Sequence, residues 1–201
     1  DCAALDKAAE ECAMPQPEEI AQFSQTGNPV PVFADEQMKI ACLAREGKIL
    51  LAVMNSSEVP MINFSLTVNG PDVLNKEVLS HPEQLVCIPP GNAILQLSTF
   101  TFPKQMRSFP QFVFSADVQF NGKKVSFQLP ASLFTFIIPE ETTTAEFGKI
   151  WKSGGTEIVY TMPRMEGVTI DNICQVLNTV VGVKTVQRIR TEEIFFGALW
   201  S

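Results

Sequence analysis

The 201-residue sequence has a single histidine, His81, and five cysteines at wide, irregular spacings. With one imidazole, most zinc hydrolases and histidine-based catalytic triads are excluded, because both need imidazole beside other catalytic groups. The odd number of cysteines and the lack of any Cys-x-x-Cys pair argue against a disulfide framework or a zinc site. We therefore expect reduced cysteines, no metal and no cofactor. The cysteines are Cys2, Cys12, Cys42, Cys87 and Cys174.

Basic blocks and long apolar runs are also missing. Fifteen Lys and Arg stand against 22 Asp and Glu, a net charge of -7, so the electrostatic footprint of a nucleic-acid-binding protein is absent. No apolar run reaches the roughly 18 residues that a membrane-spanning helix needs. The chain starts with neither Met nor a basic segment, which excludes a signal peptide and suggests a piece of a longer protein. At 45% hydrophobic and 18% charged residues, the composition is that of a globular protein.

Nothing in the sequence favours an enzyme. The paired carboxylates fall in predicted turns or linkers, where solvated charges are the simpler interpretation, and no serine has a histidine in its sequence context. Gly154-Gly155 lacks the pattern of a phosphate-binding loop. His81, in Ser80-His81-Pro82, is expected to be an exposed turn residue. We predict no catalytic residues. The carboxylate pairs are Glu18-Glu19, Glu140-Glu141 and Glu192-Glu193.

The stretch 33–133 has the pattern of short strands joined by turns. Residues 39–44 and 48–54 flank a hairpin turn, and residues 62–68 alternate between apolar and polar. Asn121-Gly122 is typical of a two-residue hairpin turn. About seven such strands without intervening helices predict an Ig-like antiparallel β-sandwich. The further predicted strands are 85–88, 93–97, 112–120 and 125–129.

The segments on either side of the sandwich differ from it. We interpret residues 1–32 as a hinge-like linker with one helical segment; an extended arm docked on the domain is the alternative. Residues 134–201 predict a small α/β unit that continues beyond Ser201. Its elements are a strand at 134–138, a helix capped by Thr143 and Glu146, a strand at 156–161, a helix at 170–180 capped by Thr169, and strands at 184–190 and 194–200.

One group of residues suggests binding. Phe147 and Trp151 lie four positions apart on the first helix of the small unit, so they share one face. Lys149 and Lys152 flank the tryptophan, which is unusual for a purely internal indole. An aromatic pair beside lysines suits a short peptide with an aromatic anchor and a nearby acidic group. The alternative to peptide binding is that Phe147 and Trp151 pack against the small sheet. For Ile150, packing in the core is expected.

The order of these features resembles the appendage (ear) domain of a large subunit of heterotetrameric clathrin-coat adaptors. The resemblance covers about residues 35–201 and is closest to the alpha type, with the epsilon type of the trans-Golgi adaptor as the rival. In the family, a β-sandwich is followed directly by a helix-containing platform. The stretches that carry the resemblance are Val125-Ser126-Phe127-Gln128-Leu129-Pro130, the apolar segment 134–138, and Glu146-Phe147-Gly148-Lys149-Ile150-Trp151-Lys152.

The resemblance implies a non-enzymatic interaction module. It would recruit trafficking accessory proteins through Asp-Pro-Phe/Trp and Phe-x-Asp-x-Phe motifs, with Phe147, Trp151, Lys149 and Lys152 as peptide-binding residues. Other adaptor subunits would be its partners in the full complex. It would lie in the cytoplasm at coated pits or vesicles of the plasma membrane or trans-Golgi, and reach the membrane only through the coat. The alternative function is a structural β-sandwich or oligomer interface without motif binding.

Three departures from the family pattern bear on the site. Gly148 stands where the alpha type has a second aromatic residue, which favours the epsilon type slightly. The family's principal pocket arginines are expected on strands beyond Trp200. On the sandwich, where the alpha type presents an aromatic residue for a second motif class, this sequence has Leu51-Ala52-Val53. A second binding site there is therefore not expected from the resemblance.

Overall fold

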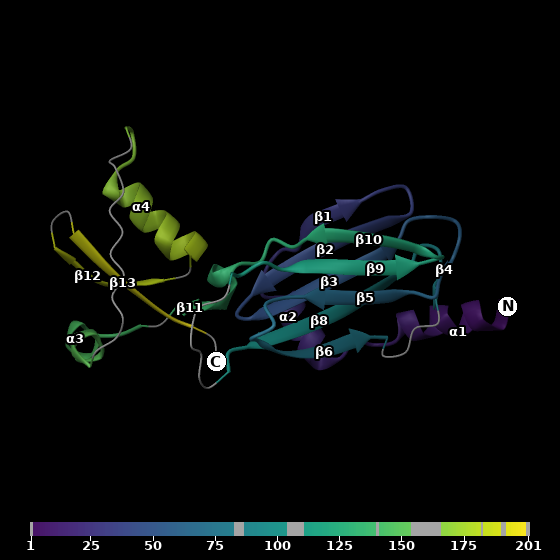
Figure 1. Ribbon diagram of the computed structural model, residues 1–201, viewed down its shortest axis with the longest axis horizontal. Coiled ribbons are helices and arrows are strands. Elements are labelled where there is room, and N and C mark those ends of the chain that lie inside the picture. The colour runs from purple at the N-terminus through teal and green to yellow at the C-terminus, as the bar shows by residue number, and fades with distance from the viewer. Residues whose placement is uncertain are drawn as a thin grey trace. The chain divides into compact units, whose positions relative to one another are not determined.

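The computed structural model describes residues 2–82, 87–103, 111–139, 141–153, 166–181, 183–189 and 192–199. The chain divides into two compact units, Asp1–Phe136 and Ile137–Trp200. The first is a sandwich of antiparallel sheets, and the second is a small sheet with helices (Figure 1). The predicted fold class, an antiparallel β-sandwich followed by a small α/β platform, is confirmed.

The first unit begins with two helices and continues almost entirely in strands. Its elements are α1 (Cys2–Ala13), α2 (Glu18–Ser24), β1 (Val30–Ala34), β2 (Met38–Arg45), β3 (Lys48–Asn55), β4 (Met61–Ile62), β5 (Ser65–Asn69), β6 (Asn75–His81), β7 (Cys87–Ile88), β8 (Ala93–Thr101), β9 (Ser115–Phe120), β10 (Lys123–Gln128) and the 3₁₀ helix η1 (Leu133–Phe136).

Two sheets form the sandwich. The larger has the strand order β1-β2-β3-β8-β6, and the smaller, in front of it in Figure 1, has the order β10-β9-β5. Both predicted hairpins are present, because β2 pairs with β3 and β9 with β10. Asn121 and Gly122 have φ angles of 49° and 73°, the positive values that a two-residue hairpin turn requires at both positions.

The core lies between the two sheets and is built from alternate strand residues. In β3, Ile49, Leu51 and Val53 are fully buried, as expected for side chains two positions apart that point to the same face. Phenylalanine rings fill the end of the core nearest η1: Phe136 lies 5.4 Å from Phe102 and 5.8 Å from Phe114, measured between ring centroids. Since Leu51 and Val53 point inward, they offer nothing to a ligand.

Several local predictions were wrong. The continuous strand expected over 62–68 is interrupted at Asn63, whose φ of 52° lies outside the extended range, so β4 and β5 are separate. His81 ends strand β6 instead of standing exposed in a turn: it is half-buried, and its Nε2 lies 3.1 Å from the carbonyl oxygen of Met14. The strand expected at 134–138 is largely the helix η1, with only Ile137 and Ile138 continuing as a strand.

Residues 1–32 are not a hinge-like linker. Helix α2 packs on the sandwich with Ile20 fully buried and Phe23 5% exposed. Ala8 of α1 is also buried, and β1 begins at Val30 as the edge strand of the larger sheet. The alternative of a docked arm is closer to the structure, although the arm is helical and not extended. Sequence periodicity could not show this, since α2 buries only two side chains.

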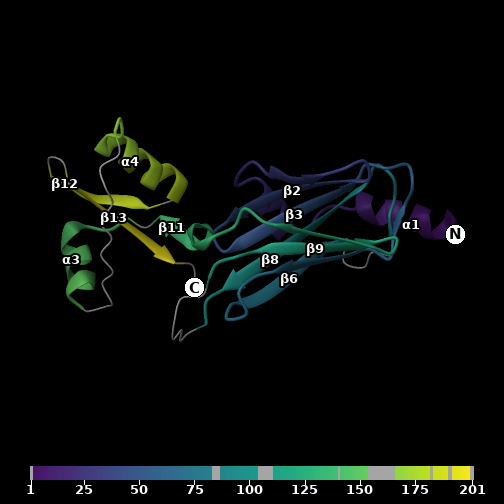
Figure 2. The same ribbon diagram turned by 45° about the horizontal axis from the view of Figure 1, so that its top comes forward.

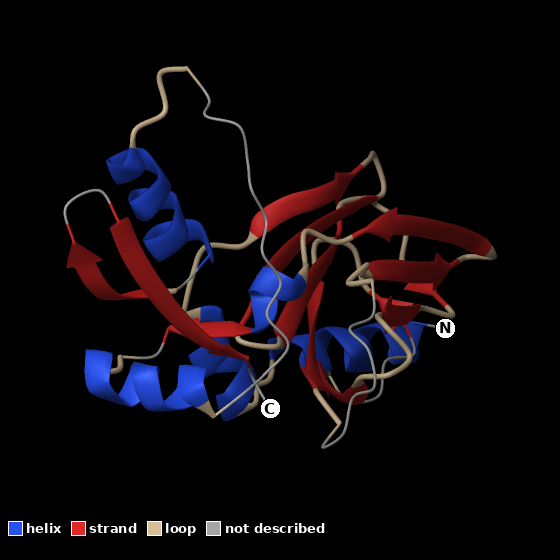
Figure 3. Ribbon diagram, turned by 60° about the vertical axis from the view of Figure 1, so that its left-hand side comes forward, coloured by secondary structure: helices blue, strands red, loops and turns tan. Residues whose placement is uncertain are grey.

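The second unit has the sheet order β11-β13-β12. In the views of Figures 1 to 3 its strands lie between α3 and α4. Thr143 and Thr169 cap the two helices, as predicted, while the strand expected at 156–161 lies outside the described residues. The elements are β11 (Ile137–Pro139), α3 (Thr144–Lys152), α4 (Ile170–Val176), the π-helical turn η2 (Leu177–Val181), β12 (Lys184–Ile189) and β13 (Glu192–Leu199).

Candidate functional site

Helix α3 begins with a complete capping box. The Thr143 hydroxyl accepts a hydrogen bond from the backbone N–H of Glu146 at 3.2 Å, and the Glu146 carboxylate accepts one from the backbone N–H of Thr143 at 3.0 Å. These bonds satisfy two N–H groups that have no partner within the helix. The bonds from Thr143, chiefly from its backbone N–H, hold the pKa of Glu146 below its ordinary value. The start of the helix, and so the direction of its side chains, is thereby fixed.

Phe147 and Trp151 form a stacked pair on this helix. Their ring centroids lie 5.9 Å apart with an angle of 28° between the planes, an offset arrangement that aromatic pairs favour. Trp151 is 62% exposed, and Phe147 is partly buried. The indole therefore has a supporting ring on one side and solvent on much of its remaining surface. Such a ring can pack against an aromatic or aliphatic anchor of another molecule.

Ile150 extends this apolar face, contrary to the expectation that it would pack in the core. It is 51% exposed and lies three positions after Phe147, on the same side of the helix. Among the described residues of α3 none is buried. The spacing along the helix already places Ile150 on the same face as the aromatic pair. Because isoleucine is apolar, the sequence favoured burial of this side chain, and only the structure shows that it is exposed.

The two lysines of α3 lie differently with respect to the aromatic pair. At about 100° per residue, Lys152 lies about 100° from Trp151 around the helix axis, whereas Lys149 lies about 160° away. Both side chains belong to exposed residues in the last turn, where cations also interact favourably with the helix dipole. Helix spacing therefore brings Lys152 closer than Lys149 to Trp151, although both lysines lie far from Phe147 around the axis, at about 140° and about 160°.

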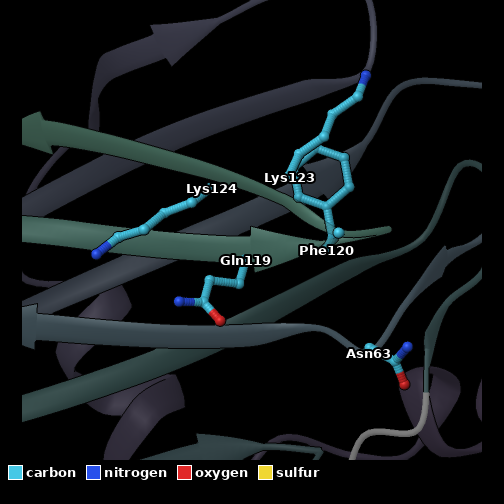
Figure 4. Close-up of a pocket in the computed structure, with 6 residues that line it drawn as sticks. Asn63, Gln119, Phe120, Lys123 and Lys124 are labelled. Carbon is cyan, nitrogen blue, oxygen red and sulfur yellow. The ribbon is translucent and has the colours of Figure 1, made fainter.

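A shallow depression lies on the sandwich at the β9–β10 hairpin (Figure 4). Its volume is about 330 Å³, and its cations already have partners. Lys123 Nζ donates to Gln37 Oε1 at 2.7 Å, and Lys124 Nζ lies 3.5 Å from Asp117 Oδ2. We assign no function to the depression. Its lining residues are Asn63, Gln119, Phe120, Gly122, Lys123 and Lys124.

Within the described ranges, no three or more His, Cys, Asp or Glu side chains are grouped so that they could hold a metal ion. None of the helices described here is both long enough and apolar enough to cross a membrane.

Comparison with known proteins gives a family match for part of the chain. Residues 139–201 match the family model of the adaptin AP4 complex epsilon appendage platform. This segment contains Phe147 and Trp151, and the match confirms the resemblance to adaptor appendage domains for that part of the chain. The matching model belongs to the epsilon type, the second of the two subunit types that the sequence resembled.

The solved structures that match part of this chain include two GAE domains from yeast. The GAE domain of GGA1 is 17% identical, with a TM-score of 0.35, and the match covers 53% of this chain and 98% of that one. The GAE domain of GGA2p from Saccharomyces cerevisiae is also 17% identical, with a TM-score of 0.34 and coverage of 51% and 98%. A search of curated proteins finds no match.

Proposed function

We propose that this chain is a non-catalytic interaction module of a vesicle-coat adaptor, and that it binds short aromatic-acidic motifs on the platform. The binding face is the aromatic pair Phe147 and Trp151, together with Lys152. The motifs are of the Asp-Pro-Phe/Trp and Phe-x-Asp-x-Phe kinds, in disordered segments of trafficking accessory proteins. The chain would act in the cytoplasm at a coat, beside other adaptor subunits, and touch the membrane only through them.

The observation that carries this proposal is the exposure of Trp151 on its stacked partner. A tryptophan that served only to fill the platform core would be buried, yet this one is 62% exposed on a capped helix. Burying an aromatic anchor against it would supply about 1.5–3 kcal/mol. The family match over residues 139–201 supports the same segment as the platform of an appendage.

The acidic part of the motif needs a local positive charge, because the chain as a whole has a net charge of -7. Lys152 is the nearest α3 cation to the indole around the helix. Lys184 on β12 is a second cation of the platform, and its Nζ lies 4.0 Å from the highly exposed carboxylate of Glu141, a long and solvated pairing that an incoming aspartate can replace. Local potential can thus attract an acidic peptide despite the unfavourable net charge.

Binding of one motif should be weak. A disordered peptide loses conformational entropy when it docks, and the anchor face is small and open. We expect dissociation constants of about micromolar or weaker for single motifs, with tighter binding for peptides that carry several copies.

The test is a titration of labelled Asp-Pro-Phe, Phe-x-Asp-x-Phe and scrambled peptides, followed by fluorescence anisotropy and two-dimensional NMR. Trp151→Ala removes the exposed indole. Phe134→Ala is the matched control, because Phe134 is 54% exposed but belongs to the sandwich unit. We expect saturable binding of at least one motif peptide to the wild type and to Phe134→Ala, and none to a folded Trp151→Ala.

The alternative function, a structural or oligomer-interface domain, predicts a different result. No motif peptide would bind, and light scattering would show self-association that Trp151→Ala abolishes. Equal binding of motif and scrambled peptides would also contradict the proposal.

A further inference from the structure

The outer face of the larger sheet carries a row of leucines. Leu43 of β2 pairs with Leu50 of β3, Leu50 with Leu97 of β8, and Leu97 with Leu79 of β6. Their neighbours along the strands, such as Leu51, point into the core on the other face. The outer face of an antiparallel sandwich is commonly polar. A leucine row across four strands therefore requires a cover.

Helix α2 provides that cover from within the same chain. Ile20 and Phe23, three positions apart, form one buried cluster with Leu43, Leu50 and Leu97, and Leu79 and Leu95 pack at its margin. Ile20 is fully buried and Phe23 is 5% exposed. In Figure 1, α2 lies behind the larger sheet, on the side away from β9 and β10. Elsewhere in α2, Ala21 and Ser24 are partly buried and the other side chains are exposed. The apolar contact therefore depends on Ile20 and Phe23.

Polar contacts hold the two ends of the segment. Lys48 Nζ lies 2.8 Å from Glu19 Oε1 in the first turn of α2. Arg45 donates to the carbonyl oxygen of Thr26, just after the helix. Arg45 also pairs with Glu46, so Lys48 is the cation that an acidic helix meets beside the apolar floor of the groove that α2 fills.

The helix that fills this groove has little stability of its own. It has seven residues, its N-cap Pro17 makes no side-chain capping bond, and Met14-Pro15-Gln16-Pro17 separates it from α1. A helix of this length is unstable in water without tertiary contacts. Its cluster with the leucines is separate from the cluster between the two sheets, so release of α2 would leave that inner core in place.

We propose that the leucine row is a helix-binding groove, which α2 occupies in cis and from which a partner helix displaces it. The partner is a short acidic helix within another protein, with an aliphatic and an aromatic residue three positions apart and a carboxylate in its first turn. The apolar pair would replace Ile20 and Phe23 on the leucines, and the carboxylate would pair with Lys48 in place of Glu19. This groove is separate from the aromatic face of α3, and neither proposal depends on the other.

The test uses the α2 sequence as the probe. A labelled peptide with the sequence of residues 17–27 is titrated into the wild type and into a variant whose own α2 is released by Ile20→Ser and Phe23→Ser. We expect saturable binding to the released variant that is at least about tenfold tighter than binding to the wild type, where α2 competes. A peptide carrying Phe23→Ala is the control and should not bind.

A charge reversal on both partners distinguishes specific binding in the groove from nonspecific binding of the peptide. Lys48→Glu in the released variant should weaken binding of the peptide, and a peptide with Glu19→Lys should restore it. If the released variant keeps the amide spectrum of the sandwich yet binds no peptide, or if both proteins bind it equally, the proposal is wrong. The readout does not involve Trp151, so failure here leaves the platform proposal intact.

If the released variant does not fold, amide hydrogen exchange of the wild type tests whether α2 can leave the groove. Backbone amides of α2 should exchange at least about tenfold faster than those of β3, through local opening of the segment. Exchange of both elements together, only on global unfolding, would make α2 a permanent part of the core and overturn the proposal. A concentration-dependent dimer that Ile20→Ser and Phe23→Ser abolish but Trp151→Ala does not would identify a second copy's α2 as the occupant and likewise overturn it.

Discussion

The indole of Trp151 stacks on the ring of Phe147, with centroids 5.9 Å apart, and keeps 62% of its surface exposed. Two residues four positions apart on a helix meet in this way because their side chains lie one turn apart on the same face. The pairing orients the indole before any ligand arrives. A face organised in advance loses less conformational entropy on binding than a single mobile side chain would.

The two lysines of α3 should contribute unequally to binding. We expect Lys152→Ala to weaken binding of an acidic motif peptide about two- to fivefold, the range of an exposed charge interaction. Lys149→Ala should have little effect, because Lys149 lies on the side of the helix away from Trp151. Anisotropy titrations at low and high salt measure both effects. Equal losses of affinity in the two variants would contradict a specific role for Lys152, because the peptide would then sense only the net positive charge of the helix.

The capping box should make α3 sensitive to acid. The pKa of Glu146 is lowered by its hydrogen bonds, so their stabilising effect is present above the unfolded value of about 4.3 and is lost as the pH falls through the lower folded value. An NMR titration that follows the side-chain carboxyl carbon of Glu146 should give a lowered pKa in the wild type and a higher pKa in Thr143→Ala. Peptide binding at the aromatic pair should decline over the same pH range.

Loss of the Thr143 cap should also be visible at neutral pH. Replacing a threonine N-cap by alanine destabilises a helix by about 0.5–2 kcal/mol. Amide exchange at the start of α3 should become faster, whereas that of β3 in the other unit should not change. An unchanged exchange rate in α3 would show that contacts other than the cap hold the helix start.

Two glycines should respond to alanine in opposite directions. Gly148 lies inside α3, and a Cβ there would meet no atom within 4 Å, so Gly148→Ala should stabilise the platform by about 0.5–1 kcal/mol. At Gly70 a Cβ would lie 2.6 Å from Cε1 of Phe114, so Gly70→Ala should destabilise the sandwich by about 1–3 kcal/mol. Thermal unfolding measures both effects, and a stabilising Gly70→Ala would contradict the close packing of Phe114 and Phe100 against Gly70.

Phe136 and Phe134 are two positions apart and differ completely in burial. Phe136 is fully buried among Phe102, Phe112 and Phe114, whereas Phe134 is 54% exposed. Phe136→Ala should lower the free energy of unfolding by about 3–5 kcal/mol. Phe134→Ala should change it by less than about 0.5 kcal/mol. Urea denaturation of the two variants gives the comparison, and similar losses would contradict the difference in burial between the two rings.

The parts of the fold that local chemistry determines could be predicted from the sequence. Alternation of apolar residues indicated the strands of the sandwich, and Asn121-Gly122 indicated the turn between β9 and β10. Thr143 with Glu146 indicated the start of α3, and the four-residue spacing of Phe147 and Trp151 indicated their pairing. Each of these depends on a short stretch of chain whose periodicity or hydrogen bonding is set by the residues themselves.

Other features depended on contacts between distant segments, and the tertiary structure decided them. The sequence of α2 shows a short polar stretch with two large apolar residues, and only the leucine row assembled from four strands gives those residues a surface to bury. The exposure of Trp151 and Ile150 likewise depends on what packs against α3, which spacing along the helix cannot specify. Periodicity determines which side chains share a face, but which face is covered depends on the elements that pack against it.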